Sequence, residues 1–214
     1  MSTIYENLFS IDEINSLILD FNSKSVTYKE IFNDVLWCEN RNLDYHIPNT
    51  TVYNIVRPKI EKILGPHEIS MGSYKESHWP YGTHTDSYAR SDFKNFTKIK
   101  DSIEHDTVVL IPLSEHEKFN TISFNCFSEH FEGHFEGMSE PYNLEWLDSS
   151  NDLVLDDLDH IPLVVRETIP KLPVDKVFNW HIGSAFTWKR TQLHTSTNFA
   201  KYGLTKKFIV IFIA

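Results

Sequence analysis

Apolar side chains near the start of the chain recur at helical spacing. In the stretch IDEINSLILDFNSK they fall on one side of a helix, at Ile11, Ile14, Leu17 and Ile18. Ser10 precedes this stretch and Glu13 follows three positions later, which is the pattern of a capping box. The pattern therefore predicts a helix that begins after Ser10.

A second amphipathic helix is predicted over residues 50–64. Its apolar side chains share one face, at Val52, Ile55, Val56, Ile60 and Ile63. Pro58 lacks a backbone donor and predicts a kink inside this segment, and Gly65–Pro66 predicts its end. Residues 1–66 are accordingly interpreted as a helical N-terminal part.

From about residue 67 the pattern changes to short runs rich in β-branched and aromatic residues. These runs are HEISMGSY, DTVVLIPL, NTISFNCF, PLVVRETI, KVFNWHI, SAFTWKR and FIVIFIA. Turn-forming residues separate them, which favours a sandwich or barrel of short strands over residues 67–214. An acidic stretch at about residues 128–160 interrupts the series and is interpreted as an exposed loop insertion. The pattern predicts a single domain, residues 1–214, that is mainly β with N-terminal helices.

Composition and charge narrow the class of partner. The chain has 30 Asp and Glu residues against 20 Lys and Arg, and this net charge of -10 repels phosphates, so nucleic acid is not expected as a partner. No run of apolar residues is long enough to cross a membrane, and the start lacks the pattern of a signal peptide. The two cysteines, Cys38 and Cys126, cannot form a disulfide framework and are expected to be reduced core thiols of a cytoplasmic protein.

Histidine, a common metal ligand, is abundant in this chain, with 11 residues. A histidine and a carboxylate two positions apart on a strand project to the same side, because residues i and i+2 share a face. Three pairs have the histidine first, in the order His-x-Asp or His-x-Glu, at His84/Asp86, His130/Glu132 and His134/Glu136. One pair with a distant second histidine would give the two-histidine, one-carboxylate site of non-haem iron(II) enzymes, which keeps positions open for other ligands.

Three features favour His84 and Asp86 over the other two pairs as metal ligands. The pair follows a β-prone run and a glycine in PYGTHTDSY, whereas the other two pairs lie in the acidic insertion, where a solvated loop is expected. His194 follows 108 residues after Asp86, which leaves room for the intervening strands to wrap around a barrel. Lys206 and Lys207 then precede the terminal run FIVIFIA, where a cation beside an apolar strand needs an anionic partner.

The competing distal ligand is His181, with Arg190 as the cation that follows it. We disfavour this choice because the residues after Arg190, Thr-Gln-Leu-His, do not form a continuous strand pattern. The residues after Lys207 form the strongest strand pattern in the chain. The sequence therefore favours His194 as the second histidine.

The order of these residues resembles that of the 2-oxoglutarate/Fe(II)-dependent dioxygenases, in particular prolyl-4-hydroxylase-like and phytanoyl-CoA-hydroxylase-like members. The matching positions are Tyr74, Gly82, His84-Thr85-Asp86, the strand from Gly183 to Trp188, His194 and Lys207. The resemblance covers about residues 67–214 and implies a double-stranded β-helix (jelly-roll) core. The chain departs from the family pattern in the short spacing between Gly82 and His84, in a lysine where arginine is commoner, and in a slightly long interval from His194 to that lysine.

The resemblance implies that the His84, Asp86 and His194 side chains bind Fe(2+) and that a lysine binds the far carboxylate of 2-oxoglutarate. We favour Lys207 because it immediately precedes the apolar run, although that run is apolar on both faces and its period does not separate Lys206 from Lys207.

Two further contacts and an activity follow from the same resemblance. Tyr74 is expected to donate to 2-oxoglutarate, with simple packing as its alternative role, and Arg90 is a candidate contact to the substrate. The implied activity couples decarboxylation of 2-oxoglutarate, with ascorbate as reductant, to hydroxylation of an unactivated C–H bond. The expected substrate is a small molecule or a peptide, and the sequence does not define it or the oligomeric state.

Two other classes of function remain open at this point. One is a cupin-type jelly-roll protein, an isomerase or hydrolase that uses zinc or manganese. The other is a binding module that keeps the fold without turnover. The metal preferred on reconstitution would distinguish the first from an iron oxygenase, and binding of 2-oxoglutarate without succinate formation would identify the second.

Overall fold

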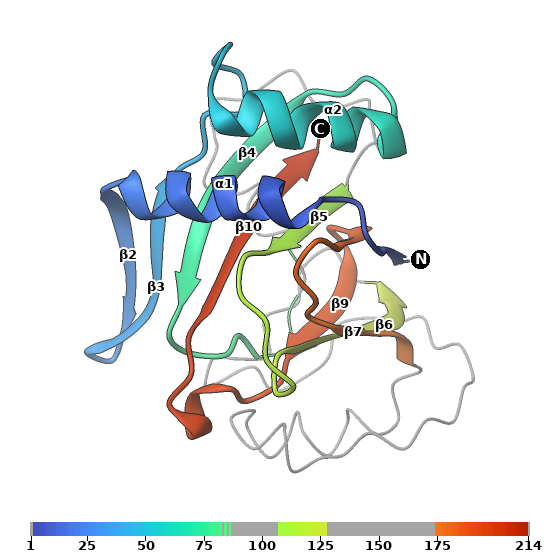
Figure 1. Cartoon of the computed structure of the whole chain (residues 1–214). Coiled ribbons are helices and arrows are strands. Elements are labelled where there is room, and N and C mark those ends of the chain that lie inside the picture. Colours follow the sequence, from blue (N-terminus) through green and yellow to red (C-terminus); the bar gives the residue numbers. More distant parts are fainter. Residues whose placement is uncertain (1, 83, 85, 87–106, 128–173, 214) are drawn as a thin grey trace.

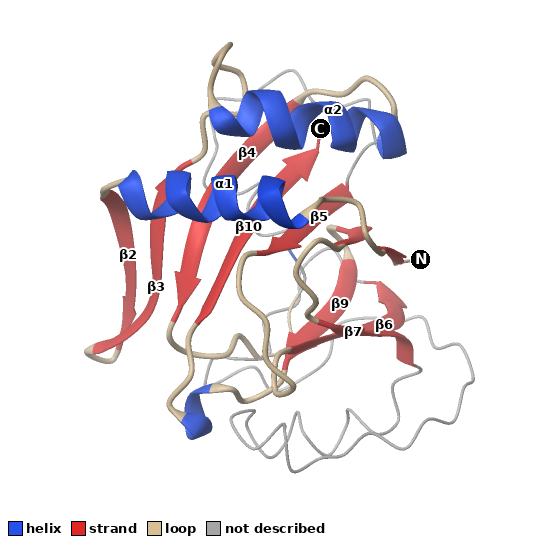
Figure 2. Cartoon of the chain, in the orientation of Figure 1, coloured by secondary structure: helices blue, strands red, loops and turns tan. Residues whose placement is uncertain are grey.

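The structure is a computed structural model that describes residues 2–82, 84, 86, 107–127 and 174–213. These residues form two antiparallel β-sheets, two α-helices and a short 3-10 helix at Ala200–Tyr202 (Figures 1 and 2). The larger sheet has seven strands in the order β1-β8-β5-β10-β4-β3-β2, and the smaller sheet has three in the order β7-β6-β9. The strands span β1 Thr3–Tyr5, β2 Val26–Phe32, β3 Val35–Asn42, β4 Ile69–Ser77, β5 Thr107–Pro112, β6 Asn120–Phe127, β7 Val174–Asn179, β8 Ala185–Lys189, β9 Gln192–Ser196 and β10 Lys206–Ile213.

The arrangement confirms the prediction of a mainly β chain with N-terminal helices. Six of the seven predicted runs coincide with or overlap β4, β5, β6, β7, β8 and β10. The seventh run, PLVVRETI, and the acidic insertion at residues 128–160 lie outside the described residues. Facing antiparallel sheets are the layer arrangement of a jelly roll.

Both predicted helices are present, with the predicted caps. Helix α1, Ile11–Ser23, begins after Ser10, whose side chain accepts from the Glu13 N–H while Glu13 accepts from the Ser10 N–H at 2.7 Å. Helix α2, Thr51–Leu64, runs unbroken through Pro58 and ends at Gly65, which has a φ of 80°. Both helices cross one face of the larger sheet (Figure 1).

The N-terminal part is not wholly helical, because β2 and β3 form a hairpin between the two helices. The loop residues Asn33 and Asp34 have φ values of 48° and 62°, as the two central positions of a type I′ turn require. The sequence carried this signal, since a two-residue Asn-Asp loop separates β-prone runs. The helical patterns on either side of this loop dominate residues 1–66 and hide the hairpin signal. Cys38 on β3 is a buried free thiol, as predicted, whereas the side chain of Cys126 lies outside the described part.

The centre of the larger sheet is buried on both faces, and β10 shows this directly. Ile209, Ile211 and Ile213 belong to the core beneath α1 and α2. Phe208, Val210 and Phe212 belong to a second core, which includes Phe178 of β7 and so lies between the two sheets. A strand at the centre of three layers is apolar on both faces. This explains why the apolar period of FIVIFIA does not predict which of its side chains face the helices and which face the small sheet.

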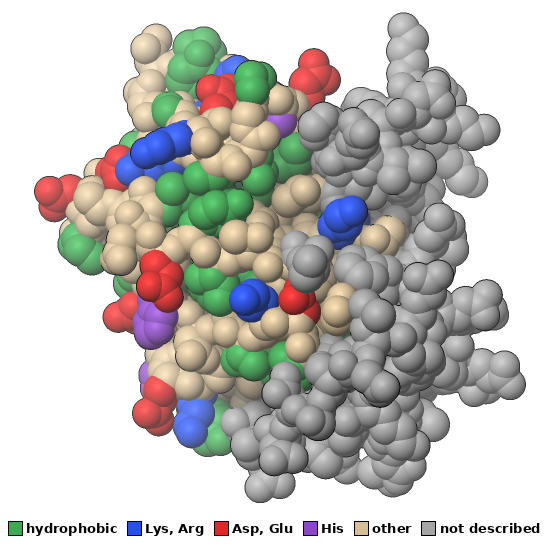
Figure 3. Space-filling model, turned by 90° about the vertical axis from the view of Figure 1, so that its right-hand side faces the viewer, with side chains coloured by type: hydrophobic (Ala, Val, Ile, Leu, Met, Phe, Trp, Pro, Cys, Tyr) green, Lys and Arg blue, Asp and Glu red, His purple; other side chains and the backbone are tan. Residues whose placement is uncertain are grey.

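Two features of the surface bear on partners. In the described part of the chain, neither helix has the length and apolarity needed to span a bilayer. Acidic and basic side chains are interspersed on the described part of the face shown in Figure 3. That face therefore offers no broad basic surface to a nucleic acid.

Replacing Ser10 by alanine tests the capping box. The Ser10→Ala protein loses the side chain that accepts from the Glu13 N–H, and we expect its free energy of unfolding to fall by about 1 kcal/mol. Ser16→Ala is the matched control, because the Ser16 hydroxyl donates to the Asp12 carbonyl inside the same helix and caps nothing. Urea unfolding measures both. Equal stability of the two variants would contradict the role given to Ser10.

Candidate metal centre

Two histidines that are 110 residues apart in the sequence meet as paired strand residues. His194 lies on β9, and His84 forms an antiparallel bridge with it. The His84 N–H donates to the His194 carbonyl over 2.9 Å, and the His194 N–H donates to the His84 carbonyl over 3.0 Å. Directly paired residues project to the same face. The imidazole rings therefore lie side by side, with centroids 4.2 Å apart.

Asp86 brings a carboxylate to the same point. Its backbone N–H donates to the Arg190 carbonyl over 2.8 Å, in the turn between β8 and β9. One carboxylate oxygen lies 3.5 Å from Nε2 of His194, and the other lies 3.9 Å from Nε2 of His84. One ligand atom from each of the three residues lies within 4.8 Å of the others. Within the described residues, this is the one cluster of three or more possible metal ligands, and it contains the residues predicted from the sequence.

Backbone carbonyls orient both imidazoles. His84 Nδ1 lies 2.6 Å from the Gly82 carbonyl oxygen, and His194 Nδ1 lies 3.1 Å from the Gln192 carbonyl oxygen. A carbonyl oxygen only accepts, so each Nδ1 is the donor, and in the neutral ring Nε2 is then the nitrogen with the lone pair. Metal-binding histidines commonly donate their other nitrogen in this way, and both Nε2 atoms here face Asp86.

The surroundings of Asp86 fit a divalent cation. The side chain is 15% exposed, and the Trp188 indole N–H donates to its Oδ2 over 2.8 Å. The Trp188 ring also packs against His194, with centroids 4.8 Å apart. Within the described chain no lysine or arginine forms an ion pair with Asp86, so the mostly buried carboxylate faces two imidazole nitrogens without a cation. Two imidazole nitrogens and one carboxylate are the donor set of a non-haem iron(II) site.

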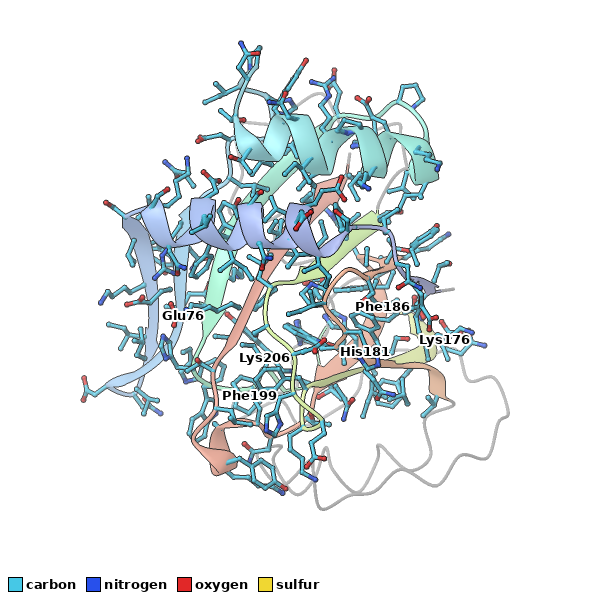
Figure 4. The ribbon with its side chains drawn as sticks, viewed as in Figure 1. Glu76, Lys176, His181, Phe186, Phe199 and Lys206 are labelled. Atoms are coloured by element: carbon cyan, nitrogen blue, oxygen red, sulfur yellow. The ribbon has the colours of Figure 1, made fainter. Side chains whose placement is uncertain are left out.

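Lys206, the first residue of β10, is buried between the sheets and is 2% exposed. Its Nζ donates to Ser196 Oγ over 2.8 Å and to the Asn120 carbonyl over 3.2 Å. Figure 4 shows Lys206 beside Phe199. Three rings surround the amine, with centroids at 4.4, 4.8 and 5.6 Å in Trp180, Phe199 and Phe119. No carboxylate of the described part pairs with Nζ, and burial lowers the pKa of Lys206 well below its usual range.

Ser196 connects this buried amine to the metal centre. It is two residues beyond His194 on β9, so the two side chains share a face and are separated by about 7 Å along the strand. The Ser196 hydroxyl accepts from Lys206. A buried amine therefore lies a short distance from the three possible metal ligands, on the same side of the small sheet.

Lys207 and Tyr74 lie on the opposite face of the larger sheet, away from the Lys206 amine. Lys207 Nζ is 3.9 Å from Glu76, and the Tyr74 hydroxyl donates to Asp20 of α1 over 2.7 Å. Side chains alternate along a strand, so adjacent lysines cannot both face the small sheet. The pairing of β10 with its neighbours decides which one does, and it is Lys206. The preference for Lys207, and the contact expected from Tyr74, do not agree with this geometry.

The competing candidates do not join the cluster. His181 is exposed in the turn before β8 (Figure 4), and Arg90 lies outside the described residues, as do His130 and His134. One argument against His181 was wrong, because Gln192–Ser196 does form strand β9. This five-residue strand is mostly polar, and its pairing with β6 rather than local pattern makes it a strand.

Sequence reasoning missed a polar cluster beside His84. Glu30 of β2 accepts from the Tyr81 hydroxyl, from Lys75 Nζ at 3.2 Å and from Asn40 Nδ2 at 2.9 Å. Burial opposes ionisation of Glu30, but these three partners outweigh it and lower the pKa of its carboxyl. Glu30 and Asn40 lie on the hairpin that the sequence analysis placed in a helical region, so no pattern linked them to the site.

Comparisons with known proteins concern the fold. No family model matches the sequence, and no curated protein does. Among solved structures, the epimerase SnoN in complex with Fe3+, alpha ketoglutarate and nogalamycin RO is similar, with a TM-score of 0.60 and 8% identity over 99% of this chain and 78% of that one. A 2OG-Fe(II) oxygenase family oxidoreductase from Burkholderia pseudomallei has a TM-score of 0.53 and 10% identity, covering 100% and 85%. HygX from Streptomyces hygroscopicus, with nickel, 2-oxoglutarate and hygromycin B bound, has a TM-score of 0.51 and 9% identity, covering 98% and 81%.

The chain has the fold of the 2-oxoglutarate/Fe(II) oxygenases. At these identities the likeness concerns the fold, and it confirms the double-stranded β-helix predicted for the core. The cluster of His84, Asp86 and His194 in this oxygenase fold rests on the distances above and not on the comparison.

Replacing Lys206 by methionine tests whether a buried amine, without a carboxylate partner among the described residues, limits the stability of this oxygenase fold. Methionine fills the same ring-lined space without a polar atom, so we expect the free energy of unfolding of the ligand-free protein to rise by roughly 1–3 kcal/mol. The folded-state pKa of Lys206 lies below the usual value of 10.5. At pH values between these two, the unfolded chain therefore binds more protons than the folded protein. Wild-type stability should therefore increase as pH rises from the folded-state pKa towards 10.5.

Urea unfolding at several pH values measures this contribution as the difference between the two proteins. The Lys206→Met protein should lack the part of the pH slope that Lys206 supplies, because it has no group that titrates there. Parallel stability curves for the wild type and the variant would show that the amine is already paired or solvated.

Proposed function

We propose that this protein is a non-haem oxygenase dependent on iron(II) and 2-oxoglutarate. In this proposal His84, Asp86 and His194 hold the iron, and Lys206 holds the far carboxylate of 2-oxoglutarate. The observation that carries it is the position of a buried amine, which has no carboxylate partner among the described residues. It lies on the same side of β9 as the three-ligand cluster, with Ser196 between them. A metal site alone would suit many enzymes, whereas the added anion position suits a metal-chelating dicarboxylate.

Lys206 supplies a strong reason for an anion to bind. A carboxylate beside Nζ would form a charge-assisted hydrogen bond and would raise the pKa that burial has lowered. The Ser196 hydroxyl is a second donor for the same carboxylate, since it lies 2.8 Å from Nζ. The surrounding rings exclude water, which strengthens the pair. A five-carbon dicarboxylate is long enough to place its other end at the metal.

The three ligand residues prepare the site for a metal that keeps open positions. Both imidazoles present Nε2 with a lone pair, and Trp188 holds one oxygen of Asp86 with its indole N–H. Iron(II) and 2-oxoglutarate, when bound, would supply oxidation of a C–H bond by dioxygen, with one oxygen atom going to the substrate and the other to succinate as 2-oxoglutarate loses carbon dioxide. The residues of this chain bind and orient these groups and limit the entry of water.

The substrate is proposed to be a small molecule, and hydroxylation is the proposed outcome. SnoN and HygX were solved with nogalamycin RO and hygromycin B, which supports a small-molecule substrate over a peptide. SnoN is described as an epimerase, so the product has to be identified by experiment.

Succinate formation is the direct test of this function. Purified protein supplied with iron(II), ascorbate and 2-oxoglutarate should form succinate in the absence of substrate, and the His194→Ala protein should not, because it lacks one of three ligands. Mass spectrometry of the acid products measures this. Tight binding of 2-oxoglutarate without succinate would favour a binding module, and activation by zinc or manganese alone would favour a cupin-type protein.

The two neighbouring lysines offer a matched pair of variants. Lys206→Met should raise the apparent dissociation constant of 2-oxoglutarate at least tenfold, because a hydrogen bond to a charged group contributes about 1.5–3 kcal/mol. Lys207→Met should leave it unchanged, since Lys207 faces Glu76 on the other side of the sheet. Calorimetric titration of the iron(II) proteins under nitrogen measures both. Loss of binding in Lys207→Met alone would refute the assignment of Lys206.

A further inference from the structure

We propose that Tyr81 is a positioning residue for the metal ligand His84, and that Glu30 of the edge strand β2 holds Tyr81 in place. The proposal rests on the metal centre proposed above. It extends that centre to the β2–β3 hairpin at the edge of the larger sheet (Figure 1). Its basis is a chain of contacts from Glu30 through Tyr81 to His84.

Tyr81 touches the metal site in two ways. Its ring packs against the His84 imidazole, with centroids 5.7 Å apart and an interplanar angle of 41°. Its carbonyl accepts from the Ser196 N–H at 3.3 Å, which ties the segment before His84 to β9. A shift of Tyr81 would therefore change both the position of the His84 ring and the register of its strand with the strand of His194.

Glu30 fixes the other end of Tyr81. The Tyr81 hydroxyl donates to Glu30 Oε2 of β2. Lys75 neutralises Glu30 at 3.2 Å and lies 5.7 Å from the centre of the Tyr81 ring. The edge of the Trp37 ring meets Tyr81 at 5.9 Å. The ring is thus held by its hydroxyl, its face and its edge.

A bulge in the hairpin contributes to this contact. Glu30 pairs with Cys38 and Ile31 pairs with Leu36, so Trp37 is an extra residue in β3. A bulge re-aims a side chain and increases the local twist. Here it accompanies the contact between Trp37 and Tyr81.

The cost of this cluster indicates a role beyond packing. Glu30 and Lys75 are mostly buried, at 28% and 18% side-chain exposure, and apolar side chains of similar volume often stabilise such positions better. A second ionic network on the same strands joins Glu39, Arg41 and Glu76, but it lies on the helix side of the sheet and contacts no ligand. Contacts that orient a metal-binding histidine affect metal affinity by about 10- to 100-fold.

Cobalt(II) alone is a suitable probe, because its visible absorption reports ligand geometry without turnover. Metal-free Tyr81→Phe and Glu30→Gln proteins should bind cobalt(II) about tenfold more weakly than wild type or worse, with an altered visible spectrum. Tyr81→Phe keeps the ring and removes only the hydroxyl, so it remains informative if Glu30→Gln leaves Lys75 unpaired and fails to fold. The double variant should be no worse than the more affected single variant, because both changes break one contact.

Glu39→Gln is the matched control. It removes a carboxylate that pairs with Lys29 and Arg41 on the opposite face, and it should keep wild-type cobalt(II) affinity and spectrum even if its stability falls. Wild-type affinity and spectrum in a folded Tyr81→Phe protein would overturn the proposed positioning role. A wild-type protein that binds neither cobalt(II) nor iron(II) would instead overturn the metal centre itself, so the two failures are distinguishable.

Discussion

The backbone pairing of His84 with His194 is the interaction on which the site depends. Two hydrogen bonds of 2.9 and 3.0 Å place the two residues opposite each other and direct both imidazoles to one face. The spacing of the His-x-Asp motif then brings Asp86 to the same point. A slip of one residue in this pairing would turn one ring away from the other, because strand side chains alternate. Strand register therefore has the same importance here as ligand identity.

The burial of the centre of the larger sheet on both faces determines the chemistry around that pairing. The inner face of β10 carries Lys206 towards the small sheet, and the outer face carries Lys207 towards α1 and Glu76. Identical side chains thus have different roles because one layer lies on each side of the strand. The helices cover the outer face and leave the inner face for the site (Figure 2).

Two charged groups in this region oppose folding of the ligand-free protein and favour binding of an ion of opposite charge. Lys206 is buried without a carboxylate in the described chain, and Asp86 faces two imidazoles without a cation. Each is a costly arrangement in an empty protein and a favourable one when an ion of opposite charge is bound. Solved structures of the same fold at 8–10% identity show that the architecture tolerates almost complete change of sequence. Function in such a fold is carried by a few placed groups.

The sequence by itself determined the helices, most strands and the three residues of the candidate metal cluster. Capping at Ser10, helical spacing and β-prone runs are local signals, and a His-x-Asp pair with a distant histidine is a pattern of residue types. Only the tertiary structure decided which of the two lysines faces the small sheet and that Gln192–Ser196 forms strand β9. It also decided that Glu30 meets Tyr81. Each of these depends on which strands pair and which face is covered. Pairing joins residues far apart in the sequence, so no local pattern contains it.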